Sequence, residues 1–425
     1  MSAAADSLND RLVVIGTGCA GIELAFSARN AGWTGPITLI GEEPDNPYQR
    51  PPLSKAFLTG EAAAESLQLR TAALYKSSKI DLQTGVRAVS IDRETKTVSL
   101  GDGTATPYDR LVLATGGRAR PLPAAEADAA AASNYFYLRT MADSAGIRAR
   151  LTPGESLVIV GGGYVGLEVA AAAVKRGMRV TVLEAAPRVL ARVTAPIVSG
   201  FYEKVHREAG VEILTGEQVE SFALSQDGQR IAEVSCASGR RLSADLVVAG
   251  IGLLPNAELA AQCGLAVDNG IVVDAGLRTS DPDIFAIGDC TRYFSTIYGR
   301  LVRIESVPSA LEQARKAAGL LCGKAVRPDA VPWFWSDQYD LNLKMVGLSS
   351  GYDHLVLRGS LEQHSFSAFY LADNRVLAVD TVNRPVEFNL SKRLIAEHIP
   401  VDATLLADEA VPLKHLLEAG QNQPG

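Results

Sequence analysis

The stretch LVIVGGGYVGLEVAAAAVKRGMRVTVLE, residues 157–184, constrains the possible folds of this chain more than any other. An apolar run leads into Gly161, Gly163 and Gly166, an alanine-rich segment follows, and a second apolar run ends at Glu184. This pattern predicts a dinucleotide-binding strand–helix–strand unit. The glycines serve a tight turn, the close approach of phosphates, and the packing of helix on strand. The pyrophosphate is expected at the positive N-terminus of the helix.

The acidic residue at the end of this unit predicts which nucleotide binds. Glu184 follows the glycines at about the 20-residue spacing at which a carboxylate typically receives ribose hydroxyls. A carboxylate there repels a 2′-phosphate. The unit is therefore predicted to bind NADH in preference to NADPH.

A second motif of the same kind lies near the start of the chain. Gly16, Gly18 and Gly21 follow a short β-rich run, and a helical stretch leads to a predicted strand over 37–40. One GxGxxG is weak evidence, whereas two in register with strands and helices predict two bound dinucleotides. Glu42 follows this strand as a candidate for an adenosine ribose, with a solvated loop carboxylate as the alternative.

Each glycine motif is followed by the same succession of helix, strand, β-meander and return strand, which indicates a duplicated architecture. We interpret the second unit as inserted into the first. The apolar run 284–287 resumes the first unit, and Asp289 just after it is placed for the ribityl hydroxyls of a flavin, with a plain turn residue as the alternative. A helix is expected to begin near Val307, with its positive end available to a reduced flavin ring.

Three basic residues outside these motifs are candidates for cofactor binding. Pro51 and Pro52 stiffen the loop that presents Arg50 and Lys55. Arg139, in the linker before the second motif, could reach a phosphate. Plain surface charge is the alternative for Arg50 and Lys55, and a surface ion pair is the alternative for Arg139.

Composition limits the remaining functions. The 425 residues, 47% of them apolar, suggest roughly three domains, and a net charge of −7 argues against nucleic-acid binding. The 5 cysteines contain no CxxC pair, so neither a disulfide framework nor a metal site is predicted. No apolar run reaches the ~20 residues of a membrane span, so a cytoplasmic location is the expectation.

The chain resembles the FAD-dependent ferredoxin and rubredoxin reductases along nearly its whole length. The stretches that carry the resemblance are VVIGTGCAG, RPPLSKAFLTG, LVLATGGRARPLP, YLRT, VIVGGGYVGLEVAA, AGIGLLPN, AIGDC, VRIESVPSALEQARK, PWFWSDQY, LKMVGLS and AVDTVNRPVEFN. The resemblance implies two nested Rossmann-like domains, as in glutathione reductase, and a C-terminal α+β domain. The implied ranges are 1–114 and 247–324 for FAD, 115–246 for NADH, and 325–425 for the C-terminal interface domain.

The same resemblance implies the chemistry: electrons pass from NADH through FAD, one at a time, to a [2Fe–2S] ferredoxin that serves a cytochrome P-450 monooxygenase. The oligomeric state stays open. The FAD contacts implied, in addition to the glycines of the first motif, are Ala20, Glu42, Arg50, Lys55, Ala88, Arg139, Asp289, Val307 and Trp335.

Lys55 and Glu168 are implied to lie beside the reactive edge of the flavin, where an opposite-charge pair would be mutually stabilised. Without the resemblance, Glu168 is an ordinary acid in the first turns of a helix. Tyr164 is expected to cover the flavin until nicotinamide displaces it, with plain packing as the alternative. Arg315 and Lys344 are candidates for docking the ferredoxin, against scattered solvated charges.

Two other functions remain open at this point. An NADH oxidase or peroxidase of similar architecture needs a redox cysteine after the second strand of the first domain, and GEEPDNPYQRPPLSK contains none. A slow redox-sensing flavoprotein of the apoptosis-inducing-factor type shares the expected fold. Its turnover rate would distinguish it from a reductase.

Overall fold

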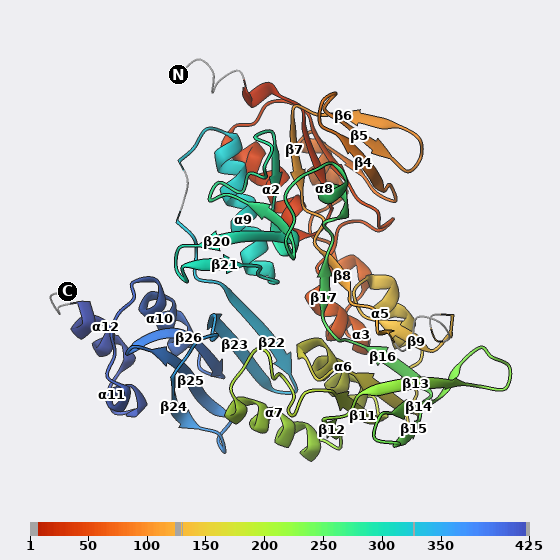
Figure 1. The fold of residues 1–425 in the computed structure, drawn as a ribbon, viewed down its shortest axis with the longest axis vertical. Coiled ribbons are helices and arrows are strands. Elements are labelled where there is room, and N and C mark those ends of the chain that lie inside the picture. The colour runs from red at the N-terminus through yellow and green to blue at the C-terminus, as the bar shows by residue number, and fades with distance from the viewer. Residues whose placement is uncertain (1–6, 124–128, 130, 326–327, 422–425) are drawn as a thin grey trace. The chain divides into compact units, whose positions relative to one another are not determined.

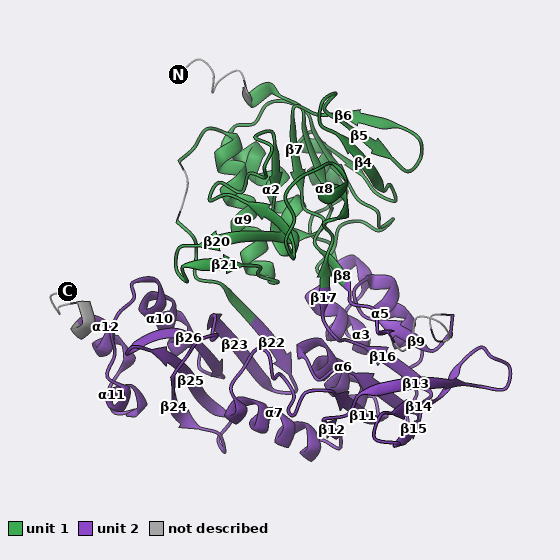
Figure 2. Cartoon of the chain, viewed as in Figure 1, with its two compact units in different colours: residues 1–49, 67–118, 254–334 green, residues 50–66, 119–253, 335–425 purple. Residues whose placement is uncertain are grey.

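A computed structural model describes residues 7–123, 129, 131–325 and 328–421. The chain divides into two compact units, each built from three separate segments (Figure 2). Unit 1 comprises 1–49, 67–118 and 254–334, and unit 2 comprises 50–66, 119–253 and 335–425. The sequence predicts a surface loop or short helix for the alanine-rich stretch 124–132, most of which lies outside the described residues.

Unit 1 is centred on a five-stranded parallel sheet (Figure 1). Its order is β19 (Ile284–Ala286), β7 (Arg110–Leu113), β1 (Leu12–Ile15), β2 (Ile37–Ile40) and β3 (Ile80–Gln83). The central strand β1 is apolar and buried at all four positions, as expected of a parallel strand covered on both faces. Helices α2 (Cys19–Ala31) and α9 (Val307–Leu321) pack on each other.

The edge strand β19 shows how the first unit is completed. It pairs in parallel with β7, although 170 residues separate Leu113 from Ile284 in the sequence. The intervening chain forms a second parallel sheet, so the prediction of one dinucleotide-binding domain nested in another is confirmed. The chain leaves unit 1 along β8 (Gly117–Ala119) and returns along β17 (Leu253–Pro255).

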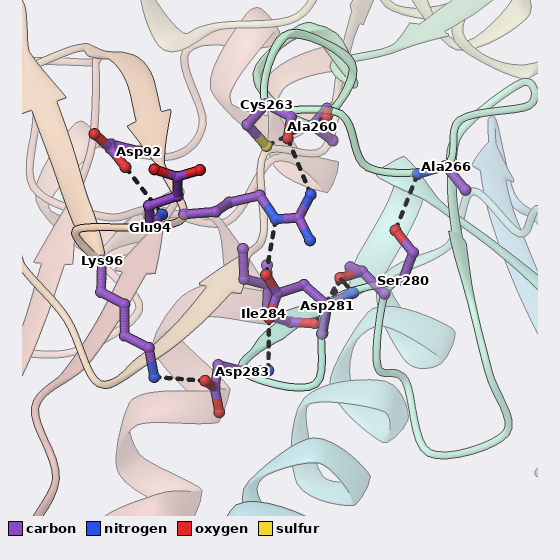
Figure 3. Close-up of polar contacts among 12 residues, drawn as sticks. Asp92, Glu94, Lys96, Ala260, Cys263, Ala266, Ser280, Asp281, Asp283 and Ile284 are labelled. Carbon is purple, nitrogen blue, oxygen red and sulfur yellow. Dashed lines mark hydrogen bonds and ion pairs between the residues drawn. The ribbon is translucent and has the colours of Figure 1, made fainter.

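Ion pairs attach the β-meander of unit 1 to the turn before β19. The meander consists of β4 (Ala88–Asp92), β5 (Thr97–Leu100) and β6 (Ala105–Pro107). Between β4 and β5, Arg93 Nε lies 2.8 Å from Asp281 Oδ2, and Lys96 Nζ lies 2.5 Å from Asp283 Oδ2 (Figure 3). These contacts position the strand that leads to Asp289.

Unit 2 contains the second parallel sheet, with the corresponding strand order. That order is β12 (Glu212–Thr215), β11 (Arg179–Glu184), β10 (Ser156–Val160), β16 (Leu246–Ala249) and β9 (Tyr135–Tyr137). Helix α6 (Tyr164–Lys175) follows β10, and α7 (Pro196–Glu208) precedes β12. A meander of β13 (Val219–Leu224), β14 (Ile231–Cys236) and β15 (Arg241–Ser243) leads into β16.

The C-terminal part of unit 2 is an antiparallel sheet with three helices. The sheet has the order β22 (Trp333–Gln338), β23 (Leu341–Gly347), β26 (Arg375–Val382), β25 (Ser365–Ala372) and β24 (His354–Ser360). The helices are α10 (Pro385–Ala396), α11 (Ala403–Ala407) and α12 (Leu413–Gln421). Strand β25 is buried at six successive positions, because it lies inside the sheet and is covered on both faces.

Short elements complete both units. In unit 1 they are η1 (Ser7–Asn9), α4 (Ala72–Ser77), α8 (Glu258–Gln262), β18 (Ile271–Val273), η5 (Gly288–Cys290), β20 (Thr291–Ser295) and β21 (Arg300–Val302). The remainder are η2 (Pro51–Ser54), α3 (Ala56–Thr59), η3 (Ala64–Leu67) and α5 (Met141–Arg148). Among the described residues, no helix has both the length and the apolar character to cross a membrane.

A buried arginine stabilises the C-terminal part. Arg358 is 5% exposed, and its Nε lies 2.9 Å from Glu387 Oε1. Its other nitrogens donate to the carbonyl oxygens of Leu406, Asp408 and Val411, at 3.0, 2.6 and 3.0 Å. One side chain therefore links β24 to α10, to α11 and to the segment after α11.

We predict that Arg358→Ala lowers the free energy of unfolding by about 3 kcal/mol, because it leaves a buried carboxylate and three carbonyl groups without their main donor. Urea-induced unfolding measures the change. Arg393→Ala is the control, since it removes only an exposed helical pair with Glu397 and is expected to cost below about 0.5 kcal/mol. Equal losses for the two variants would contradict the assignment.

Candidate functional site

The glycines of the first motif form a cradle made of backbone. A Cβ atom on Gly16, whose φ is +114°, would lie 2.1 Å from the carbonyl oxygen of Ala114. A Cβ on Gly21 would lie 2.0 Å from the carbonyl oxygen of Gly16. Gly18, at the N-cap of α2, has no atom within 4 Å of its Cβ position. The outer glycines are therefore required for packing, while the middle one borders open space at the helix N-terminus.

The second motif repeats this arrangement in unit 2. A Cβ on Gly161 would lie 2.5 Å from the carbonyl oxygen of Gly250, and one on Gly166 would lie 2.1 Å from that of Gly161. The Cβ position of Gly163, the N-cap of α6, is again open. Open space beside unpaired N–H groups at a helix start is what a pyrophosphate needs. The two cradles therefore fit two dinucleotides, FAD and NADH.

Glu184 lies at the rim of the second cradle. Its Oε2 accepts a hydrogen bond from the Gly162 N–H at 2.8 Å, and its Oε1 accepts one from the Ala186 N–H at 2.8 Å. These bonds hold the carboxylate at the C-terminal end of β11, beside the glycine loop. It can receive ribose hydroxyls from there.

In unit 1, the turn after β19 packs against the start of α2. A Cβ on Gly288 would lie 3.3 Å from the Cβ of Ala20, so Asp289 follows close to the first glycine motif. Gln313 of α9 fixes this turn, because its Oε1 accepts from the Gly288 N–H at 2.7 Å. Gln313 was not among the residues predicted from the sequence; its signal is a polar residue on the buried face of α9, which is otherwise apolar and mostly alanine.

The other residues of unit 1 that were predicted to bind FAD differ in position and in exposure to solvent. Val307 is the first residue of α9, which Ser306 caps through its side-chain oxygen. Glu42 is 68% exposed and lies 3.6 Å from Arg87 Nη1, so it faces solvent as a ribose ligand can. Ala88 is buried in β4.

Lys55 and Glu168 are joined in unit 2, as the resemblance implied. Lys55 Nζ lies 2.8 Å from Glu168 Oε2, and the two side chains are 22% and 5% exposed. Ser54 Oγ donates to the same carboxylate at 2.5 Å, and Ser336 Oγ donates to Glu168 Oε1 at 2.6 Å. Three donors therefore contact this one buried carboxylate. Both serines escaped the sequence analysis, although Ser54 directly precedes Lys55 and Ser336 directly follows Trp335.

Arg50, Arg139, Tyr164 and Trp335, which were also predicted from the sequence to bind or cover a cofactor, lie in unit 2. Arg50 Nη1 donates to the carbonyl oxygen of Arg139 at 2.6 Å, which brings the two basic candidates together. Trp335 lies in the middle of β22. The Tyr164 hydroxyl contacts the sulfur of Met345 in β23.

Arg315 and Lys344, the two residues predicted to dock the ferredoxin, contact different kinds of side chain. Arg315 of unit 1 contacts Glu23 Oε1 at 2.7 Å and Glu312 Oε1 at 3.0 Å. The Glu23 hydrogen bond is the main cause that raises the pKa of Arg315. Lys344 of unit 2 lies with Nζ 5.3 Å from the centre of the Phe388 ring.

A buried carboxyl group, with no basic partner in the described part of the chain, lies near Tyr164. Asp380 Oδ2 accepts hydrogen bonds from Thr194 Oγ1 and from the Tyr370 hydroxyl, both at 2.5 Å. Burial raises the pKa of Asp380 to about 6, although the two hydroxyl donors oppose the shift. Burial is also the main cause that raises the pKa of Tyr164, followed by Asp380 and Tyr370.

Comparison with known proteins agrees with this geometry. Residues 10–314 match the family described as pyridine nucleotide-disulphide oxidoreductase, and residues 333–417 match the family described as reductase C-terminal. Putidaredoxin reductase CamA of Pseudomonas putida is 57% identical, over 97% of this chain and 98% of its own length. Rhodocoxin reductase of Rhodococcus erythropolis is 45% identical, over 95% and 93%.

Solved structures give the same likeness. The covalent complex of putidaredoxin reductase with putidaredoxin matches at a TM-score of 0.96 and 57% identity, covering 98% of this chain and 100% of the matched chain. The ferredoxin reductase for the CYP199A2 system from Rhodopseudomonas palustris matches at a TM-score of 0.90 and 41% identity, covering 96% and 99%.

We predict that the stability of the protein relative to Asp380→Asn falls as the pH rises. The pKa of Asp380 is higher in the folded state than its usual value of 3.8, so its contribution is complete at low pH and is lost through about pH 6. Between about pH 5 and about pH 8 the loss amounts to roughly 1.4 kcal/mol. Urea-induced unfolding of both proteins measures it, and parallel pH curves would contradict the prediction.

Proposed function

Because the chain belongs to the pyridine nucleotide-disulphide oxidoreductase family, we propose that it is the NADH-dependent flavoprotein reductase of a [2Fe–2S] ferredoxin. Its cofactors are FAD and NADH. The overall reaction is NADH plus two oxidised ferredoxins, giving NAD⁺, a proton and two reduced ferredoxins. When bound, FAD takes up two electrons as hydride and passes them on singly.

One observation carries the proposal: the chain contains two glycine cradles, each open at its middle glycine and each at a helix N-terminus. Two dinucleotides in one chain suit a hydride transfer from one to the other. The ion pair of Lys55 with Glu168 adds a partly buried charge suited to stabilising electron density that arrives on a flavin.

Residue roles follow from these settings. We assign FAD to the cradle of unit 1, and NADH to the cradle of unit 2, whose rim carboxylate Glu184 selects against a 2′-phosphate. Tyr164 is proposed to cover the flavin and to yield to nicotinamide. The FAD residues proposed are Gly16, Gly18, Ala20, Gly21, Glu42, Arg50, Lys55, Ala88, Arg139, Asp289, Val307 and Trp335.

The names of the relatives support the choice of partner. Putidaredoxin reductase has been captured in a complex with putidaredoxin, and the Rhodopseudomonas palustris relative is the ferredoxin reductase of a CYP199A2 system. We therefore propose a ferredoxin that supplies a cytochrome P-450, in the cytoplasm. The domain ranges 1–114, 115–246, 247–324 and 325–425 are proposed as functional divisions.

The test is anaerobic titration of the purified protein with NADH, followed by mixing with candidate ferredoxins and cytochrome c. The proposal expects a yellow protein that NADH bleaches, and fast cytochrome c reduction that requires ferredoxin. A colourless protein that does not take up added FAD would refute it. Slow reduction with a long-lived charge-transfer complex would instead favour the redox-sensing module.

We predict that Lys55→Met slows flavin reduction by NADH about 10- to 100-fold, because the charge beside the flavin is lost and Glu168 keeps no cationic partner. Anaerobic stopped-flow measurement in a single turnover isolates this step. Lys175→Met is the control, since it removes an exposed pair with Glu61 in the same unit. Equal rates for the two variants would exclude Lys55 from the reaction.

We also predict that neutralising Arg315 and Lys344 together raises the apparent KM for ferredoxin several-fold and flattens its dependence on salt. Ferricyanide reduction by NADH should stay unchanged, because it requires no docking. The double variant Arg393→Gln and Lys414→Gln removes the same charge at exposed helical positions. If both double variants weaken ferredoxin binding equally, net charge rather than these two positions is responsible.

A further inference from the structure

A chain of buried hydrogen bonds runs from Glu168 towards the surface of unit 2. Ser336 Oγ donates to Glu168 Oε1 at 2.6 Å, and Gln338 Nε2 donates to Ser336 Oγ at 3.0 Å. His206 Nε2 lies 2.8 Å from Gln338 Oε1, and His206 Nδ1 lies 3.0 Å from the Tyr339 hydroxyl. We call these five residues the Glu168 chain.

The donors in the Glu168 chain all point the same way. With its amide nitrogen on Ser336, Gln338 presents its oxygen to His206, so that histidine carries its proton on Nε2. The Nδ1 of His206 is then an acceptor, and Tyr339 donates to it. The proton of Ser336 is left for Glu168, which as a carboxylate can only accept.

Reversing the Gln338 amide would undo this arrangement. The amide oxygen would then face Ser336 and compete with Glu168 for the single hydroxyl proton. The His206 ring would have to accept on Nε2 from the amide nitrogen. The orientation of one glutamine therefore decides whether the buried carboxylate receives its third donor.

Water cannot replace these bonds, because the middle of the Glu168 chain is sealed. Ser336 and His206 are 0% exposed and Gln338 is 1% exposed, while Tyr339 is 40% exposed at the outer end. Burial lowers the pKa of His206, against the opposing effect of its Gln338 hydrogen bond, so the ring is neutral at neutral pH. A neutral ring with one N–H and one lone pair is the form that the chain requires.

The Glu168 chain joins three separate elements of unit 2. His206 belongs to α7 of the inserted domain, Ser336 and Gln338 to β22 of the C-terminal part, and Glu168 to α6 after the second glycine motif. We propose that Gln338 and His206 are positioning residues. They orient the Ser336 hydroxyl, which holds the Glu168 carboxylate where Lys55 meets it.

This inference rests on the proposed function in one respect, which is the role of the Lys55–Glu168 ion pair in flavin reduction. The proton positions can be measured without any turnover. The chain has 5 histidines, so the ring signals of His206 in the ¹⁵N-labelled holoenzyme can be identified by their loss in His206→Gln.

The first measurement is the tautomer of His206 by ¹⁵N NMR between about pH 7 and about pH 8. The proposal expects one neutral form with the proton on Nε2, unchanged across this range. Gln338→Leu removes the acceptor and should give a mixture of both tautomers. A proton on Nδ1 in the unaltered protein, or a ring that titrates freely, would overturn the proposal whatever the activity.

The second measurement is flavin reduction by NADH in a single turnover. Ser336→Ala and Gln338→Leu should each slow reduction about tenfold, below the roughly 100-fold that a 1 Å misplacement can cost, with NADH affinity unchanged. His206→Gln should keep most of the rate, because its amide nitrogen can donate to Gln338 in place of the ring.

Ser391→Ala is the matched control for Ser336→Ala. Ser391 is also 0% exposed in the C-terminal part, and its Oγ donates to the Glu387 carbonyl at 2.7 Å. Where Lys55→Met slows reduction, equal rates for the two alanine variants would overturn the positioning role. If Lys55→Met leaves the rate unchanged while His206 carries its proton on Nε2, the proposed role of the ion pair fails and the Glu168 chain stands.

Discussion

The close contact between backbone segments at the first glycine of each motif is the constraint on which both nucleotide-binding domains depend. Gly16 meets the carbonyl group of Ala114, and Gly161 meets that of Gly250, so in each sheet the loop after the first strand lies directly against the end of the return strand. Any side chain there would force these segments apart. The helix N-terminus, the open middle glycine and the neighbouring acidic residues all take their positions from this contact.

The fold could be predicted from the sequence because its signals are local. Apolar runs at 12–15 and 157–160 end in glycines at set spacings, and the structure has strands at these places. Ser336, Gln338 and His206 could not be predicted to meet Glu168, because they come from elements far apart in sequence and their bonds depend on how β22 and α7 pack. Asp380 gave no sequence signal either, since its burial is a property of the assembled sheet.

Among the described residues of unit 2, three carboxyl groups are buried, and each is stabilised differently. Glu387 pairs with Arg358, and Glu168 combines a lysine with two serine hydroxyls. Among the described residues, Asp380 has hydroxyl donors and no cationic partner, and burial raises its pKa to about 6. A basic side chain beside the carboxylate therefore distinguishes Glu387 and Glu168 from Asp380. The carboxylate proposed to act in electron transfer thus has a cation beside it, while the one near Tyr164 does not.

Because β19 lies far along the sequence, the two parallel sheets receive their last strands at different stages of synthesis. The sheet of the inserted domain has all its strands once residue 249 has been synthesised, because β9 fills its outer position. The sheet of the first domain waits for residues 284–286, and α9 follows only at 307–321. On the ribosome the inner domain can therefore complete its sheet first, while the N-terminal glycine motif remains part of an unfinished sheet.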